Sequence, residues 1–233
     1  MSGAPLVVAV DGPSGSGKSS VCREVASRLG LAYLDTGAMY RAATWWCVAQ
    51  GVDLVDADGV TRTVAAADLA VGLDPRSPTV AVNGQDVAAA IREPAVSEAV
   101  SLVAVNLGVR ADLRARQRAV IAAERLPTGH AGGRGVVVEG RDITTVVAPD
   151  ADVRVLLTAS ERVRLNRRAR ELYGTADAVA LAVTHDQVVL RDAADATVVD
   201  FRTAADGVVS VDSSELDFDQ TVAAVLAVIA EGP

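Results

Sequence analysis

The sequence is poor in lysine, aromatic residues and cysteine, and each shortage narrows the class of protein to which the chain can belong. Aromatic residues make up 3% of the 233 positions, which leaves few rings to stack on unpaired bases. The net charge of −8 gives the surface as a whole no attraction for polynucleotides or anionic membranes. We therefore expect no nucleic-acid partner and no membrane association.

The two cysteines and the short apolar runs indicate the cellular compartment in which the protein works. Cys22 and Cys47 fall in separate predicted helices, which is typical of reduced, buried thiols rather than of a disulfide framework. Asp11 interrupts the first apolar run before it reaches the length of a secretory leader. The late apolar run at 222–230 is too short to span a bilayer. We expect a globular, monomeric and cytoplasmic protein.

The single lysine lies in the stretch around which the chain is organised. Residues 12–19 fit the pattern G-x-x-x-x-G-K-[ST] of the phosphate-binding P-loop, behind an apolar run at 6–10 and ahead of a helical pattern at 19–29. In such a loop the backbone N–H groups surround phosphate oxygens, and the following helix adds its positive end. In a chain with 21 arginines, the compact ammonium of Lys18 suits a closed backbone loop better than a planar guanidinium would.

The P-loop predicts a site for ATP and for Mg²⁺. Lys18 would reach the β- and γ-phosphates, and the Ser19 hydroxyl would bind the metal. The residues expected to bind ATP are Gly12, Pro13, Ser14, Gly15, Ser16, Gly17, Lys18, Ser19 and Ser20.

Apolar, β-branched runs alternate with helical patterns along most of the chain. Strands are predicted at 6–10, 31–34, 135–138, 153–157 and 208–211. Helices are predicted at 19–29, 38–50, 61–69, 159–172, 184–191 and 217–230, and across 96–125 with a break near 106–108. This alternation is typical of an α/β fold, in which a doubly wound parallel sheet carries helices on both faces and binds ligands at the carboxyl ends of its strands.

Two segments depart from that alternation. Between 52 and 95, short segments around Leu73 and 79–82 precede Asn83-Gly84, a hairpin-turn signal that indicates a small insertion. The helix predicted at 159–172 is rich in cations, which would form either an RNA-binding face or a lid over ATP phosphates. Its arginines are Arg162, Arg164, Arg167, Arg168 and Arg170. The acidic net charge and the scarcity of aromatic residues favour the lid.

Charged side chains follow the predicted strands at the edge of the sheet that bears the P-loop. Arg41 and Arg141 come soon after strand ends, where they would hold phosphate groups. Glu139 and Asp142 are the carboxylates expected near Mg²⁺, bound directly or through water. The residues alone do not decide which of these two carboxylates assists Ser19.

Read in order, these motifs resemble the bacterial cytidylate kinases of the P-loop nucleoside monophosphate kinase superfamily. The blocks that match are 11–19, 34–41, 84–87 with 91–92, 109–110 with 117–118, and 138–142. The segment with Arg191-Asp192 and Asp195 fits less fully. The resemblance implies that ATP, with Mg²⁺, donates its γ-phosphoryl group to CMP or dCMP. It also implies a P-loop core at 1–36, 96–158 and 192–233, a monophosphate-binding insertion at 37–95 and a helical lid at 159–191.

The resemblance assigns roles residue by residue. Cytosine would be read by Ser101, Arg110 and Asp142. The CMP phosphate would be held by Thr36, Arg41 and Arg141, and the sugar by Tyr40, Arg191 and Asp195. The catalytic charges would be those of Lys18, Arg141, Arg164, Arg167 and Arg168.

One departure from the family pattern leaves alternatives open. The family usually has arginine three residues after the second aspartate of its R-D-x-x-D segment, where this chain has Val198, and the segment up to Asp206 is short. Losing one charged contact to phosphate costs about 2–5 kcal/mol of binding or transition-state stabilisation. Arg202 is our candidate substitute. The alternatives are a P-loop kinase for another small acceptor, or a catalytically weak nucleotide-binding protein.

Overall fold

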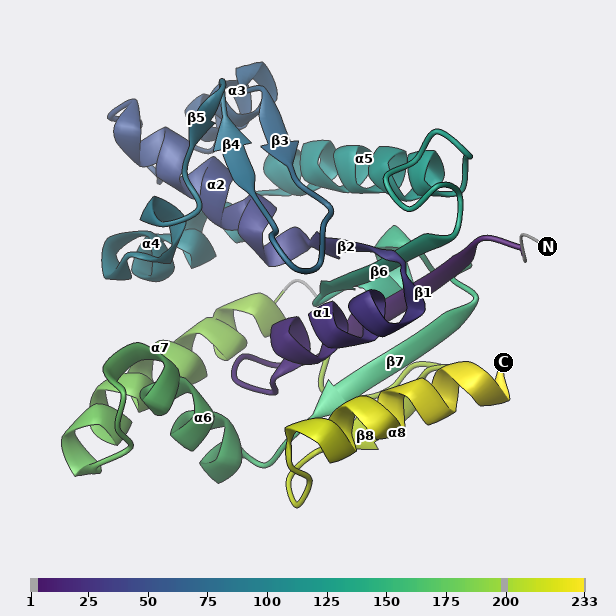
Figure 1. Cartoon of the computed structure of the whole chain (residues 1–233). Helices are drawn as coiled ribbons and strands as arrows, with labels where there is room; N and C mark the ends of the chain where they lie inside the picture. Colours follow the sequence, from purple (N-terminus) through teal and green to yellow (C-terminus); the bar gives the residue numbers. More distant parts are fainter. Residues whose placement is uncertain (1–3, 198–200, 233) are drawn as a thin grey trace.

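The computed structural model describes residues 4–197 and 201–232 (Figure 1). Within these residues, five strands form a sheet in which every neighbouring pair is parallel. Their order across the sheet is β2 (Ala32–Asp35), β6 (Gly135–Gly140), β1 (Leu6–Asp11), β7 (Val153–Thr158) and β8 (Val209–Asp212). The inner strands are nearly continuous apolar runs because side chains on both faces of a parallel sheet are buried.

Helices cover both faces of this sheet, and alternate side chains of each strand pack on opposite layers (Figure 1). Val136 and Val138 of β6 pack in one cluster with side chains of α2 (Thr36–Ala49) and α5 (Leu107–Glu124). Val137 packs in the other, with α1 (Lys18–Leu29) and α8 (Phe218–Glu231). The predicted α/β fold with a doubly wound parallel sheet is confirmed.

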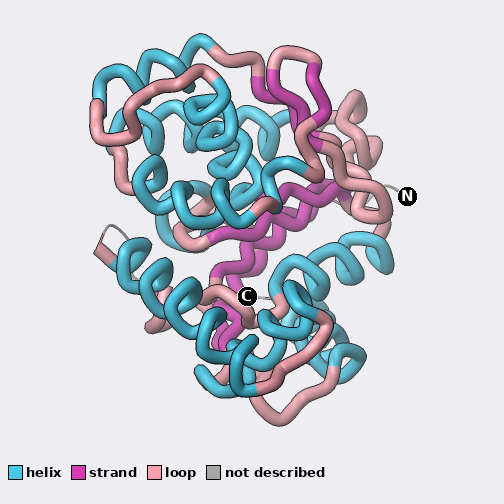
Figure 2. Tube along the Cα trace, turned by 90° about the vertical axis from the view of Figure 1, so that its left-hand side faces the viewer, coloured by secondary structure: helices cyan, strands magenta, loops and turns pink. Residues whose placement is uncertain are grey.

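A small antiparallel sheet forms the predicted insertion. It follows α3 (Ala57–Ala66) and has the order β3 (Leu69–Val71), β4 (Val80–Val82), β5 (Gln85–Asp86). The predicted turn joins β4 to β5, with positive φ of 49° at Asn83 and 79° at Gly84. Figure 2 shows this sheet at one end of the molecule, apart from the strands that cross its middle.

The remaining helices lie toward the opposite end and beside the insertion. The helices α6 (Glu161–Tyr173) and α7 (Ala178–Ala196) pack against each other, and α7 also reaches α4 (Pro94–Ala104) (Figure 1). A short 3-10 turn, η1 (Ala90–Arg92), precedes α4. The α6–α7 pair is the arginine-rich unit that the sequence predicts as a lid.

Helix boundaries depart from the prediction in three places. The helix predicted at 61–69 is α3, which begins at Ala57 because Asp56 caps it. The helix predicted at 184–191 is part of the longer α7. A π-helical turn, η2 (Ile143–Val147), follows Asp142 and was not predicted. No helix in 4–197 or 201–232 combines the length and apolar character needed to cross a bilayer.

Candidate active site

A cavity of about 600 Å³ opens where β1, β2 and β6 end. Its walls include Lys18 of the P-loop, Thr36 and Arg41 of α2, Arg110 of α5, and Arg141 after β6. Residues from four separate parts of the chain therefore converge on one cavity. A kinase that transfers a phosphoryl group between two nucleotides requires both sets of residues to face one cavity, as they do here.

The P-loop adopts the backbone conformation that its glycines allow. Gly15 and Gly17 have φ of 76° and 88°, in the left-handed region that other residues avoid. Lys18 Nζ donates to the Pro13 carbonyl at 3.2 Å, so the ammonium folds back over the loop. No side chain caps the start of α1, which leaves its first backbone N–H groups to a ligand. The loop is therefore arranged as an anion site.

Glu139 is buried at the carboxyl end of β6, beside Ser19 and Lys18. Burial raises the pKa of Glu139, the nearby Asp35 carboxylate adds to that rise, and Lys18 and hydrogen bonds from Ser19 and Tyr33 oppose it. Burial, with the charge of Glu139, also raises the pKa of Tyr33 well above its usual value, so its hydroxyl keeps its proton and donates to Glu139. Glu139 thus lies beside the P-loop hydroxyl, and Asp35 is a second carboxylate on the same cavity wall.

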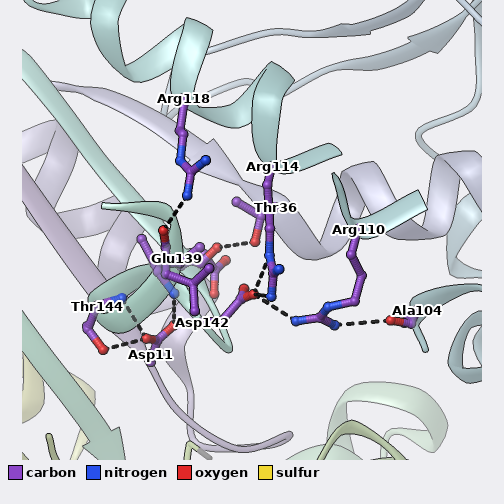
Figure 3. A network of polar contacts seen from close by, with 11 residues as sticks. Asp11, Thr36, Ala104, Arg110, Arg114, Arg118, Glu139, Asp142 and Thr144 are labelled. Atoms are coloured by element: carbon purple, nitrogen blue, oxygen red, sulfur yellow. Dashed lines mark hydrogen bonds and ion pairs between the residues drawn. The ribbon is translucent and has the colours of Figure 1, made fainter. Parts of the chain in front are cut away.

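Asp142, in contrast, is tied to α5 (Figure 3). Its Oδ2 accepts from Arg110 Nη2 at 2.7 Å and from Arg114 Nε and Nη2 at 3.0 and 2.7 Å. Arg118, one turn further along the helix, donates instead to the carbonyls of Val146 and Val147. Of the two carboxylates that the residues left open for the metal, Glu139 is therefore the one beside Ser19.

Asp11 connects the strand before the P-loop to the turn that follows Asp142 (Figure 3). Its carboxylate accepts from the backbone N–H groups of Ile143 and Thr144 at 2.9 and 2.8 Å, and from Thr144 Oγ1 at 2.7 Å. These bonds explain the π-helical turn, because they satisfy donors at its start that have no partner within the turn. The turn places Arg141 and Asp142 on the cavity wall.

Arg141 is held by partners on three segments. Its Nη1 donates to the Gly12 carbonyl at 2.5 Å, and its Nη2 lies 3.3 Å from Asp192 of α7. Its guanidinium carbon also lies 4.9 Å from the centre of the buried Phe201 ring, a cation–π contact. Asp192 further accepts from the Ser14 N–H at 3.1 Å, so α7, the P-loop and Arg141 meet at one carboxylate.

The lid arginines reach the P-loop from α6. Arg164 Nη1 donates to the Ser14 carbonyl at 2.9 Å and to Asp192 at 2.6 Å. Arg167 donates to the Ser16 carbonyl at 3.2 Å and also bonds Ser213. Arg168 lines the cavity. The arginines of α6 thus surround the loop that is arranged for phosphate.

On α2, the predicted phosphate and sugar contacts share one face. Thr36 Oγ1 donates to the Glu139 carbonyl at 2.7 Å, and Arg41 Nη2 pairs with Asp35 at 3.2 Å. Tyr40 lines the same cavity. Asp35 begins this helix by accepting from the Ala38 N–H at 2.8 Å, which fixes the start of α2 relative to the sheet.

Comparison with known proteins identifies the family. The family model described as cytidylate kinase matches residues 8–231. The chain belongs to the cytidylate kinase family. It is 42% identical to a cytidylate kinase of Streptomyces avermitilis, with 97% of this chain and 93% of that one covered, and 46% identical to one of Cutibacterium acnes, with 97% and 96% covered. A cytidylate kinase of Rhodococcus opacus is 45% identical, with 99% and 97% covered.

Some residues that the cytidylate kinase resemblance assigns are not among the cavity walls. Ser101 of α4 does not line the cavity, whereas Ser97, Val100 and Ala104 of the same helix do. Arg164 and Arg167 contact the P-loop backbone from outside the cavity. The side chains of Arg191 and Asp195, and the whole of Val198, lie outside the described residues. Arg202 is exposed, and its role as substitute stays a prediction.

Reasoning from sequence did not assign roles to Asp11, Asp35, Arg114 and Asp192 in this cytidylate kinase. A signal was present for two of them. Asp35 ends a strand just before a helix, where an N-cap belongs, and Arg114 shares a helix face with Arg110. Asp192 belongs to the R-D-x-x-D segment, but its partners Ser14, Arg141 and Arg164 could not be predicted because they are far away in the sequence.

Proposed function

We propose that this protein transfers the γ-phosphoryl group of ATP to CMP or dCMP, giving ADP and CDP or dCDP. The observation that carries the proposal is one cavity with a P-loop at one end and a paired Arg110–Asp142 at the other. Membership of the cytidylate kinase family supports it. Three further arginines line the same cavity and supply positive charge there. They are Arg41, Arg141 and Arg168.

Phosphoryl transfer requires positive charge around the transferred group and around both flanking oxygens. The P-loop N–H groups and Lys18 would hold the β- and γ-phosphates of ATP. Arg41 and Arg141 would hold the phosphate of CMP, which is already a nucleophile, so the transfer is direct and in line. The arginines of α6, which reach the P-loop from the lid, would neutralise charge as it moves.

The residues beside Ser19 fit Mg²⁺. A hydroxyl and carboxylates are the hard oxygen donors that this ion prefers, and Glu139 and Asp35 supply two carboxylates. Burial, and then the charge of Asp35, raise the pKa of Glu139. Within 4–197 and 201–232, no group of three or more His, Cys, Asp or Glu side chains converges, here or elsewhere, so the protein offers the ion two carboxylates and a hydroxyl at this site. We infer that Ser19 and Glu139 hold the ion together with the phosphates of ATP. Bound Mg²⁺ would neutralise charge on the β- and γ-phosphates.

The far end of the cavity suits a cytosine edge. A carboxylate accepts from the exocyclic amino group of cytosine, and a guanidinium donates to its carbonyl oxygen and ring nitrogen. Asp142 and Arg110 present these two functions side by side, 2.7 Å apart. Ser97 lines the cavity and Ser101 does not, and replacing each serine by alanine would assign the contact.

The test is an ADP-release assay with ATP and Mg²⁺ on CMP, dCMP, UMP, AMP and shikimate. We expect turnover on CMP and dCMP, and its loss in Lys18→Ala. Preference for another acceptor would overturn the proposal and favour the kinase of different specificity that the Val198 departure allows. Nucleotide binding without turnover on any acceptor would favour the catalytically weak protein. The Arg202→Ala variant tests the substitute contact, since unchanged kcat/KM for CMP would exclude it.

We also infer that the protein works as a cytoplasmic monomer. Residues of this chain line the cavity from the P-loop to Arg110 and Asp142, which requires no second subunit. Cys22 and Cys47 are buried free thiols, which suits a reducing compartment. Sedimentation of the purified protein with and without nucleotides tests the monomer. A dimer that forms at the assay concentration would contradict it.

A further inference from the structure

Arg114 lies behind the base-reading end of the cavity and does not line it. It is one helical turn after Arg110 on α5, so the two side chains leave the same face of the helix. Its guanidinium meets Asp142 in a forked arrangement, with both Nε and Nη2 donating to Oδ2 (Figure 3). Its side chain is 23% exposed, against 7% for Arg110 and Asp142.

Arg110 and Arg114 both donate to the same oxygen of Asp142, Oδ2, and neither donates to Oδ1. Three N–H groups converge on Oδ2, at 2.7, 3.0 and 2.7 Å. No donor within 4–197 and 201–232 reaches Oδ1. A carboxylate that accepts on one oxygen from two cations is held in a fixed orientation, and its remaining oxygen can only accept.

Arg110 by itself does not impose that orientation. Its Nη1 is committed to the Ala104 carbonyl at 3.0 Å, and only Nη2 reaches Asp142 (Figure 3). Arg110 also lines the cavity, where a base would compete for its remaining donors. Arg114 meets neither demand, because in the described part of the chain both of its hydrogen bonds go to Asp142, from outside the cavity.

We propose that Arg114 is a positioning residue for base discrimination, which rests on the proposed reading of cytosine by Asp142. By holding Oδ2, it keeps Asp142 as an acceptor whose Oδ1 meets the exocyclic amino group of cytosine. Uracil presents a carbonyl oxygen at that position, so two acceptors would face each other and the base would be rejected. Without Arg114, Asp142 can turn away from this orientation, and the penalty against uracil falls.

The experiment compares Arg114→Gln, Arg114→Lys and the control Arg118→Gln. Arg118 leaves the same helix face one turn later and bonds only backbone carbonyls, at Val146 and Val147. The readout is the ratio of kcat/KM for CMP to kcat/KM for UMP. We expect Arg114→Gln to lower this ratio about ten- to a hundredfold, mainly through a higher KM for CMP. Arg114→Lys should restore part of it, because an ammonium supplies charge without the fork. Arg118→Gln should leave the ratio unchanged.

Asp142→Asn separates this inference from the function on which it rests. If Asp142→Asn leaves the ratio unchanged, Asp142 does not read the base, and the proposed reading of cytosine fails. If Asp142→Asn collapses the ratio while Arg114→Gln lowers both activities in parallel, cytosine reading stands and the positioning role of Arg114 is overturned. Thermal unfolding of each variant confirms that the folded protein is assayed, and Arg114→Lys decides the question should Arg114→Gln not fold.

Discussion

Replacing Asp11 by alanine tests the connection between the P-loop strand and the cavity wall. Asp11 is 2% exposed and accepts from two backbone N–H groups and one hydroxyl. In Asp11→Ala the Thr144 hydroxyl can rotate toward another acceptor, but the N–H groups of Ile143 and Thr144 stay buried without one. Each orphaned buried donor costs about 1–3 kcal/mol, so the variant should lose roughly 2–6 kcal/mol of unfolding free energy. That is a large part of the total of about 5–15 kcal/mol for a typical domain.

The same substitution should impair catalysis more than the loss of stability explains. Asp11 directly precedes Gly12, and the turn that it holds directly follows Arg141 and Asp142. When that turn loosens, the P-loop and the Arg110–Asp142 pair are no longer held in register. A misplacement of about 1 Å can reduce a rate roughly a hundredfold, so kcat/KM should fall by about ten- to a hundredfold at temperatures where the variant is folded.

Urea unfolding at fixed temperature measures the stability effect, with Thr144→Val as the matched control. This control removes the hydroxyl bond to Asp11 and leaves both backbone donors satisfied, so it should cost about 1–2 kcal/mol. The double variant gives the coupling between the two residues. If Asp11→Ala costs no more than Thr144→Val, the two amides do not depend on Asp11, and this account of the turn is wrong.

The remaining predictions concern the P-loop backbone, pH and thiol reactivity. Gly12→Ala would place its Cβ 2.1 Å from the Leu157 carbonyl oxygen, whereas Gly51, also at positive φ, has nothing within 4 Å. Gly12→Ala should therefore destabilise the protein by about 1–3 kcal/mol more than Gly51→Ala in urea unfolding, and equal costs would refute the clash. Burial raises the pKa of Asp11 above its usual 3.8, against its three hydrogen bonds, so the folded state holds this proton more tightly than the unfolded chain does. Its contribution is then complete below that usual value and declines as pH rises through the raised pKa, so the stability of the protein relative to Asp11→Asn should fall from about pH 4 upward, and a rise would contradict this. Burial raises the pKa of the Cys22 thiol well above 9.0, so a thiol reagent at about pH 8 should label it only as fast as the protein opens, and rapid native labelling would show that it is accessible.

Local patterns were sufficient to predict the architecture. The P-loop could be placed because its chemistry requires glycines, a lysine and a hydroxyl at fixed spacing between a strand and a helix, and all of these are contiguous in 6–29. The parallel sheet could be predicted because a strand buried on both faces is a nearly continuous apolar run, as 6–10 and 135–138 are. The hairpin at Asn83-Gly84 was predictable because its backbone needs positive φ at two successive positions.

Those local patterns could not predict which side chains far apart in the sequence would contact each other. Glu139 contacts the P-loop hydroxyl of Ser19, whereas Asp142 is paired with Arg110 and Arg114 of α5. This difference follows from the way α5 packs on the sheet, and these arginines are far from Asp142 in the sequence. The orientation of α4 likewise decides that Ser97 rather than Ser101 lines the cavity. Asp192 joins the lid, the P-loop and Arg141 only once α7 packs in place. Periodicity tells which face of an element is buried, but which charges then meet follows from how the buried faces fit together.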